Sequence, residues 1–489
     1  MRSLKAKTVS GVKWDVLSKV AQKACSVASF AILARILEPS SFGLFAMAFV
    51  LIDGLGLFRA LGIDSAIIQK KNLPEKAIHT AFFMIQTTGI VMFGICYLVA
   101  PLAAWFFKNS EVTSVIQALG VLFVISCFGR VSRALLVKEM RFRLISTIEI
   151  IGTVVNAVLA VAFTCLSRSV WSLVGAYLVK QVVMSTLQWW YSGYRVKWQF
   201  DLTLAKELFD FGKFLVGISF IWFFGSSLST ALVGRELGAT KLGYYVLACN
   251  LTYFINSHFT QIVSDVMFPA YSKLQGDSEA MKRAYLKTVK YVSVFTIPFS
   301  VALMTLAKEF TLFFYGGKWI ATIPLIQVAA VSQFMVPIVI CASSIFTACG
   351  NPHYSYRLAL LDLVLKIPTF YILIKLWGLM GAIVAGLVVL IVYLPVYFYL
   401  LKKIVSFKLT ELVQQLLPST YCSLVMWASI LGLKMLLHAY PLLSYSASRV
   451  LPLIIFGFTG LGVYLFTFNF VDRASSVEIK RMIFKLEST

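Results

Sequence analysis

Long apolar runs separated by short polar segments make up almost the whole chain. A helix needs about 20 mainly apolar residues to cross the hydrocarbon core of a bilayer, and each run is long enough. No connecting segment is long enough for a soluble domain. The pattern predicts an all-α polytopic membrane protein with about fourteen transmembrane helices, at approximately 12–36, 41–65, 79–105, 112–137, 146–167, 170–191, 209–234, 243–268, 285–307, 320–348, 354–376, 378–400, 413–437 and 449–470.

The composition agrees with that pattern. Of the 489 residues, 59% are hydrophobic and 13% are charged, whereas soluble domains average about 45–50% apolar and about 25% charged residues. The mean hydropathy is +0.84. These values exclude a string of soluble domains, a disordered chain and a collagen-like chain. The eight cysteines show no C-x-x-C spacing, so we interpret them as small buried hydrophobic residues.

The net charge of +23 has a topological interpretation. Lys and Arg collect in the segments that share a side with the N-terminus, and the opposite side holds few, such as Arg35, Lys108 and Arg168. Cytoplasmic loops of membrane proteins carry this excess. The pattern predicts a multi-pass membrane protein with both termini in the cytoplasm. Basic runs interleaved with stacking aromatics are absent, so nucleic acid is not an expected partner.

Two stretches in the first half of the chain recur in the second half. LARILEPSSFGLFAMA begins at Leu33 and LVGRELGATKLGYYVLA at Leu232, while VWSLVGAYL begins at Val170 and LWGLMGAIV at Leu376. The matched pairs are Arg35 with Arg235, Leu37 with Leu237, Gly43 with Gly243, Ala48 with Ala248, Trp171 with Trp377 and Gly175 with Gly381. The pairs occur in the same order, which indicates an internal repeat in parallel orientation. Such repeats are typical of alternating-access transporters, with the substrate site between the repeats.

The repeat predicts a division into lobes. We expect an N-terminal lobe at 1–195 (spans one to six), a cytoplasmic linker at 196–208 and a C-terminal lobe at 209–402 (spans seven to twelve). Residues 403–489 would add spans thirteen and fourteen and a cytoplasmic tail.

Ionisable residues within the first two spans are the main candidates for function, because charge inside a membrane is costly. They are Lys13, Asp15, Lys19 and Lys23 in the first span and Asp53, Arg59 and Asp64 in the second. In one interpretation these charges neutralise one another, as the pairs Asp15 with Lys19, Lys23 with Asp53, and Arg59 with Asp64. In the other, Lys19, Lys23 and Arg59 line a hydrated cationic cavity that binds an anionic head group such as a diphosphate.

Motifs for enzymatic chemistry are absent. The sequence has no G-x-x-x-x-G-K-[ST] loop, no H-E-x-x-H and no G-x-S-x-G. Clustered carboxylates in an aqueous loop are also missing. We therefore expect neither an enzyme nor a bound metal or cofactor.

Several stretches resemble the polysaccharide-repeat-unit flippases of Wzx type, the polysaccharide transporter branch of the multidrug/oligosaccharidyl-lipid/polysaccharide exporter superfamily. The matching stretches are KTVSGVKW from Lys7, LARILEPSSFGLFAMAFV from Leu33, LGIDSAIIQKKN from Leu61, GRELGATKLGYYVLACNL from Gly234, VMFPAYSKLQGD from Val266 and GGKWIATIPLIQ from Gly316. The resemblance implies a location in a bacterial inner membrane and a V-shaped cavity lined by helices one, two, seven and eight. It implies that basic residues there receive the diphosphate of an undecaprenyl-diphosphate-linked oligosaccharide, and that a polysaccharide polymerase and export machinery are partners.

The seventh and eighth spans depart from the family's pattern. They carry no basic residue at the expected depth, and the eighth offers His258 and Asp265 as its ionisable residues. Asn250, Asn256 and Gln261 are candidates for neutral hydrogen bonds to sugar hydroxyls. Asp15, Asp53, Asp64 and His258 complete the set of polar or ion-coupling candidates, although a lone histidine in an apolar span is more often a structural residue.

The function expected from these observations is translocation of undecaprenyl-diphosphate-linked oligosaccharide repeat units from the cytoplasmic to the periplasmic leaflet by alternating access. This step would serve exopolysaccharide, lipopolysaccharide or capsule export. One alternative is a cation-coupled multidrug exporter of the same superfamily, which would need acidic residues in its cavity. A second alternative is an integral-membrane glycosyltransferase or polymerase.

Overall fold

The structure is a computed structural model that describes residues 2–59, 62–69, 73–439 and 450–478. All regular elements of these residues are helical. The chain forms two compact units, Met1–Gly243 and Tyr244–Thr489, and each is described by itself.

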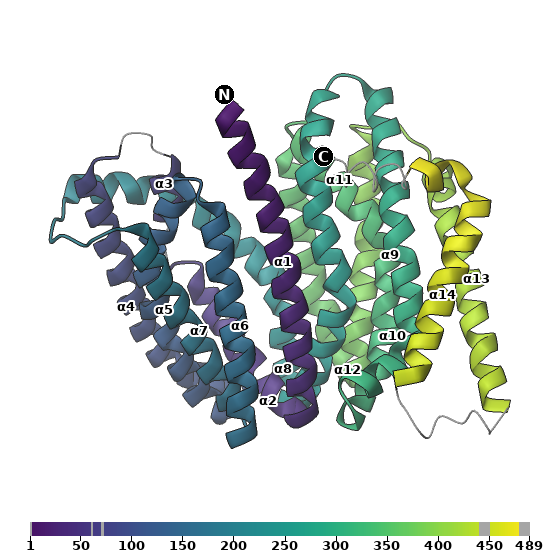
Figure 1. Ribbon diagram of the computed structural model, residues 1–489, viewed down its shortest axis with the longest axis horizontal. Coiled ribbons are helices and arrows are strands. Elements are labelled where there is room, and N and C mark those ends of the chain that lie inside the picture. Colours follow the sequence, from purple (N-terminus) through teal and green to yellow (C-terminus); the bar gives the residue numbers. More distant parts are fainter. Residues whose placement is uncertain (1, 60–61, 70–72, 440–449, 479–489) are drawn as a thin grey trace. The chain divides into compact units, whose positions relative to one another are not determined.

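The first unit is a bundle of long helices (Figure 1). The helix α4 packs against α5, α5 and α6 pack against α7, and α1 packs along α6. The shorter helix α2 contacts α4, α5 and α7. The helices of this unit are α1 (Arg2–Ile36), α2 (Pro39–Gly56), α3 (Ile63–Gln69), α4 (Glu75–Phe107), α5 (Glu111–Lys138), α6 (Phe142–Ser167), α7 (Val170–Ser192) and the first part of α8 (Leu202–Lys273).

The second unit is centred on α9, which packs against α10, α11, α13 and α14. The yellow-green helices α13 and α14 in Figure 1 also pack on each other. Its elements after α8 are α9 (Ser278–Phe314), the 3-10 helices η1 (Gly317–Thr322) and η2 (Ser332–Met335), α10 (Ile323–Val331), α11 (Val336–Ala348), α12 (Pro352–Lys402), α13 (Leu409–Ala439) and α14 (Val450–Val471).

Two of the longest helices each contain a break. At Gly238 in α8 the backbone has φ 79° and ψ 177°, and at Gly378 in α12 it has φ 58° and ψ −130°. Side chains strongly disfavour positive φ, and glycine does not. The break at Gly238 falls between predicted spans 209–234 and 243–268, and the break at Gly378 falls at the first residue of predicted span 378–400, directly after span 354–376. The sequence therefore predicted both interruptions.

The structure confirms an all-helical polytopic membrane protein. Ten helices in the described residues are long and apolar enough to cross a membrane. One predicted span is wrong: a single helix at 41–65 is replaced by α2, which ends at Gly56, a turn, and the short helix α3. Gly54 and Gly56 lower the helix propensity at this end. A second predicted span, 320–348, contains the 3-10 turn η2 immediately before Pro337.

Candidate functional site

A polar cluster lies within the first unit where α2 ends. The guanidinium of Arg59 donates a hydrogen bond from Nη1 to the Ser126 hydroxyl of α5 at 3.0 Å. Its Nε atom is buried and has no hydrogen-bond partner in the described part of the chain. The Cys127 thiol approaches the Arg59 carbonyl oxygen at 3.7 Å. The turn after α2 therefore places the Arg59 guanidinium against α5 and leaves its Nε–H donor available for a further hydrogen bond.

Asp64 is bound to a different arginine from the one expected. The Nε and Nη2 atoms of Arg130 donate to Oδ2 of Asp64 at 3.2 and 2.9 Å. The expected pair of Arg59 with Asp64 is therefore wrong. The reason is geometric: α3 packs on α5, which brings Asp64 to Arg130. Asp64 is thus a structural anion that holds α3 in place.

Asp53 lies on α2, six residues before Arg59, and is exposed. It is the carboxylate that acts electrostatically on Arg59. The described residues show no ion pair between Asp53 and Lys23, and the charge that acts on the Asp53 carboxylate is that of Arg59. The cluster at the end of α2 therefore contains Asp53 and Arg59 beside the ion pair of Asp64 with Arg130.

Aromatic rings lie next to this cluster. Phe45 and Phe49, two turns and one turn before Asp53, have ring centroids 5.1 Å apart. The ring of Tyr177 on α7 packs edge to face against Phe49, with the ring centroids 5.2 Å apart. Tyr177 also interacts electrostatically with Asp53 and Arg59. Lys180, one turn further along α7, lies 5.7 Å from the Tyr177 ring centroid. Sequence reasoning missed Tyr177. The spacing of Phe45, Phe49 and Asp53 places all three on one face of α2, and this face was the available signal for an aromatic partner beside Asp53.

The candidate lysines of α1 lie on another helix. Lys19 is exposed and Lys23 is half-buried on α1, and both interact with other groups. The side chain of Asp15 lies outside the described residues. The structure thus brings together Asp53, Arg59 and their aromatic neighbours. It does not pair them with Lys19 or Lys23.

The candidates of the second unit are only partly described. Asn250 is exposed on α8. The side chains of Asn256, His258 and Gln261 lie outside the described residues, although their backbone belongs to α8. Asp362 and Lys366 of α12 form an ion pair at 2.6 Å, as their four-residue spacing suggests.

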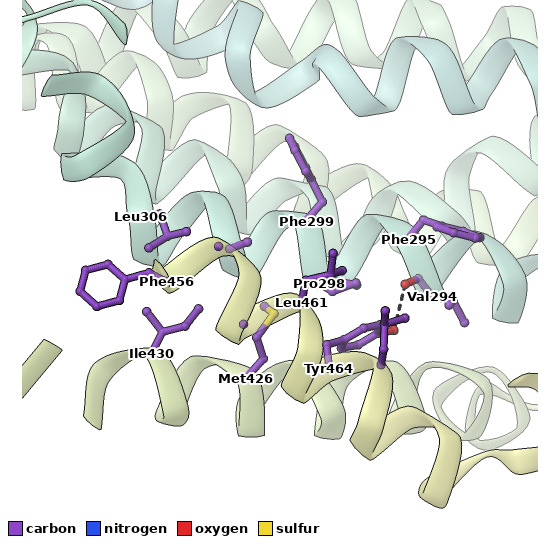
Figure 2. A pocket seen from close by; sticks show the side chains of 14 residues that line it. Val294, Phe295, Pro298, Phe299, Leu306, Met426, Ile430, Phe456, Leu461 and Tyr464 are labelled. Carbon is purple, nitrogen blue, oxygen red and sulfur yellow. Dashed lines mark hydrogen bonds between the residues drawn. The ribbon is translucent and has the colours of Figure 1, made fainter. Parts of the chain in front are cut away.

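An apolar cavity of about 350 Å³ lies in the second unit between α9, α13 and α14 (Figure 2). The phenol of Tyr464 points to α9 and donates to the Val294 carbonyl oxygen at 2.9 Å, as the dashed line in Figure 2 shows. The residues lining the cavity are Val294, Phe295, Pro298, Phe299, Ala302, Leu306, Met426, Ile430, Phe456, Gly457, Gly460, Leu461, Tyr464 and Leu465.

The segment between α7 and α8 is tied to the start of α4. Lys76 binds Asp201 at 3.0 Å and Lys197 binds Glu75 at 2.6 Å. The hydrogen bond from Lys76 holds the pKa of the Asp201 carboxyl below its ordinary value. The buried ring of His79 meets the Tyr194 hydroxyl at 2.9 Å. We call these contacts the linker clamp, since they fix the chain segment that follows the sixth predicted span.

Known proteins are similar to this chain in sequence and in fold. A family model described as polysaccharide biosynthesis protein matches residues 32–324. The chain is 29% identical to the lipopolysaccharide biosynthesis protein WzxC of Escherichia coli (strain K12), over 86% of each chain. It is 27% identical to the succinoglycan biosynthesis transport protein ExoT of Rhizobium meliloti (strain 1021), over 68% of this chain and 67% of that protein. Its fold matches that of the lipid II flippase MurJ in an inward closed conformation, with a TM-score of 0.74, 16% identity, and coverage of 94% of this chain and 99% of that one.

Proposed function

Because the chain belongs to the polysaccharide biosynthesis protein family, we propose that it is a flippase for lipid-linked oligosaccharide repeat units. The family model covers more than half of the chain, which confirms the resemblance to the Wzx-type flippases. WzxC is named for lipopolysaccharide biosynthesis and ExoT for succinoglycan transport. The proposed cargo is accordingly an undecaprenyl-diphosphate-linked oligosaccharide that leaves the cytoplasmic leaflet for the periplasmic one.

Physical chemistry makes such a protein necessary. The diphosphate and sugar hydroxyls of the cargo would be unpaired in hydrocarbon, and burying unpaired polar and charged groups is costly. A flippase lowers this barrier by offering donors along a hydrated path, while the polyprenyl tail stays among lipids. The protein needs no covalent chemistry for this step, in line with the expectation that it is not an enzyme.

The observation that supports the proposal most directly is the incomplete hydrogen bonding of Arg59. Its half-buried guanidinium makes one hydrogen bond, to Ser126, among the residues that the structure describes. An arginine binds phosphate oxygens through several parallel N–H donors. Asp64, which would have neutralised it, is held by Arg130 instead. Arg59 is thus the proposed contact for the diphosphate, and Lys19 and Lys23 of α1 remain proposed members of the same cationic path.

The proposed architecture has fourteen spans. Besides the ten helices counted as spans, α1, both parts of α8 and a second span within α12 would complete the set. The lobes proposed from the repeat, 1–195 and 209–402, would alternate access to a central site, with 403–489 supplying the last two spans and the tail. Both termini would lie in the cytoplasm of a bacterial inner membrane, with a polysaccharide polymerase and export machinery as partners.

The multidrug-exporter alternative is less well supported. A cavity for cationic drugs needs acidic groups in excess, and around the end of α2 two carboxylates, Asp53 and Asp64, are balanced by two arginines, Arg59 and Arg130. Binding of a fluorescent cationic dye to the purified protein would favour that alternative.

The deciding experiment measures lipids in cells. The gene is deleted in a host without close paralogues, and membrane lipids are analysed by mass spectrometry while surface polysaccharide is quantified. We expect undecaprenyl-diphosphate oligosaccharide to accumulate and surface polymer to disappear, with recovery when the unchanged gene is restored. Persistence of polymer without accumulation of the intermediate would contradict the proposed function.

A further inference from the structure

The apolar cavity of the second unit has the length of one leaflet. Along α9 it extends from Val294 to Leu306, which corresponds to roughly 18 Å of helix. The hydrocarbon core of a bilayer is about 30 Å thick, so the cavity is slightly longer than half of it. Leu461 and Leu465 on its α14 side are more than half exposed, which opens it to the surrounding lipid. Its shape therefore suits the chains of a lipid from one leaflet.

A charged pair lies beside one end of this cavity. Glu309 is three residues beyond the lining residue Leu306 on α9, and Lys434 is four residues beyond Ile430 on α13. Oε1 of Glu309 and Nζ of Lys434 are 2.9 Å apart. The same ammonium lies 5.5 Å from the ring centroid of Phe456, which lines the cavity on α14. A ligand at this end of the cavity can thus contact apolar side chains and the charged pair at the same time.

The hydrogen bonds of this pair are incomplete. An ammonium has three donors, and Lys434 uses one toward Glu309 and one toward the Thr305 carbonyl oxygen at 2.7 Å. Oε2 of Glu309 is buried and has no hydrogen-bond partner in the described part of the chain. A buried acceptor without a donor is destabilising. The site therefore lacks one donor for Glu309 and has one donor of Lys434 to offer.

We propose that this cavity is a binding site for a phospholipid with a primary ammonium head group, such as phosphatidylethanolamine. The ammonium of the lipid donates to Oε2 of Glu309 after a small rotation of the carboxylate. The third N–H of Lys434 donates to the lipid phosphate, and an acyl chain fills the cavity down to Tyr464. In the proposed orientation this lipid belongs to the periplasmic leaflet. The site concerns a lipid of the bilayer and does not depend on the cargo.

Other lipids satisfy the site less well. The trimethylammonium of a choline lipid has no N–H to give to Glu309. A glycerol head group can donate to Glu309 only from neutral hydroxyls, and it has no cation to offset its phosphate charge beside that carboxylate. A polyprenyl chain would fill the cavity but leave both the Glu309 oxygen and the Lys434 donor unused. Of these head groups, only ethanolamine supplies both a charged N–H donor for Glu309 and a phosphate acceptor for Lys434.

The first test uses the unchanged protein. The purified full-length chain is delipidated, and binding of phosphatidylethanolamine, phosphatidylcholine and phosphatidylglycerol with identical acyl chains is compared by native mass spectrometry. We expect the ethanolamine lipid to bind about tenfold more tightly than the choline lipid, the factor expected for one charge-assisted hydrogen bond. Equal binding of the three head groups would overturn the proposal.

Two variants and a control locate the binding. Glu309→Gln should remove the preference for ethanolamine and leave acyl-chain binding. Gly457→Leu should displace the lipid, since a Cβ at Gly457 has no neighbour within 4 Å in the described residues and would grow into the cavity. The control is Gly462→Leu on the same helix. A Cβ at Gly462 also has no neighbour within 4 Å in the described residues, but Gly462 does not line the cavity.

The outcomes separate this site from the flippase function. Loss of the bound ethanolamine lipid in Gly457→Leu, with retention in Gly462→Leu, supports the proposal. Retention in both, or tighter binding of a polyprenyl phosphate than of phosphatidylethanolamine, contradicts it. The assay uses no oligosaccharide, so its result stands even if the proposed cargo is wrong.

Discussion

Arg59 and Asp64 are five residues apart, yet the structure gives them different partners. Asp64 accepts both hydrogen bonds of Arg130, while Arg59 donates to the neutral hydroxyl of Ser126. Arg130 therefore stabilises the fold through its ion pair, whereas Arg59 keeps N–H donors that can bind another group. This division at the level of single side chains predicts opposite effects of two arginine substitutions.

Replacement of Arg59 should remove transport and spare the fold. For Arg59→Ala we expect at least a tenfold loss of surface polysaccharide with normal amounts of protein in the membrane, because the diphosphate loses its charge-assisted donors. Arg59→Lys should recover part of the activity, since it restores the charge without the planar fork. Polymer assays and membrane immunoblots measure the two quantities. Normal transport by Arg59→Ala would exclude Arg59 as the diphosphate contact.

Replacement of Arg130 should act on stability instead. Arg130→Met leaves the Asp64 carboxylate, which is about one quarter exposed, without its partner. Removing one member of a partly buried ion pair is costly because the other charge stays behind. We expect a lower midpoint of thermal unfolding in detergent. The double variant Arg130→Met/Asp64→Asn should recover part of the loss; two additive losses would mean that the pair is not coupled.

Among the helices, the internal repeat has a direct structural counterpart. A Cβ on Gly43 of α2 would overlap the backbone carbonyl of Ala239, and a Cβ on Gly243 would overlap that of Pro39. Pro39 and Ala239 are separated by the same 200 positions as the two glycines. The start of α2 and the equivalent part of α8 therefore cross through a reciprocal contact that needs small residues on both sides.

This crossing predicts a strong effect of a single methyl group. Gly43→Ala should destabilise the protein by about 1–3 kcal/mol, as is usual for overpacking against a rigid neighbour, and Gly243→Ala should act similarly. Thermal unfolding of the purified variants measures this. Gly56→Ala is the matched control, because it lies on the same helix and its Cβ would meet nothing within 4 Å in the described residues. Equal stability of Gly43→Ala and Gly56→Ala would contradict the close crossing.

The linker clamp predicts a dependence on pH. The pKa of Asp201 is lowered by the hydrogen bond from Lys76, so its stabilising contribution is complete above the ordinary aspartate pKa of about 3.9 and is lost as the pH falls through the lowered value. Asp201→Asn should therefore lower the unfolding midpoint at pH 7, with a gap that closes toward pH 3. Lys76→Met should show the same trend, and a gap independent of pH would contradict the assignment.

Most helices could be predicted from the sequence because apolar runs of membrane length have one stable conformation in lipid. The break at Gly238 lies in a gap between predicted spans, and the break at Gly378 lies at the predicted start of a span. The end of α2 was missed because its turn remains apolar enough to continue the hydropathy pattern. The partner of Asp64 was missed for a related reason: proximity along the chain favoured Arg59, whereas packing of α3 on α5 selects Arg130.

For the molecule as a whole, the number of spans decides the proposed mechanism. A lobe of six spans repeated in parallel requires that both parts of α8 cross the membrane, with the break at Gly238 on the side opposite the linker. If α8 crossed once, the repeats would have opposite orientations. The apolar pattern favours two crossings, and a direct measurement of sidedness can decide between them.

Single cysteines at three exposed positions test this topology. Gln199 precedes α8, Thr240 follows its break, and Lys273 ends it. In a variant in which all eight native cysteines are replaced, we expect Thr240→Cys to react with a membrane-impermeant maleimide in intact spheroplasts. Gln199→Cys and Lys273→Cys should react only after the membrane is opened, because the positive-inside pattern places both in the cytoplasm. Labelling of Gln199→Cys and Lys273→Cys from opposite sides would mean that α8 crosses the membrane once. That result would contradict the parallel six-span repeat and the alternating-access mechanism that depends on it.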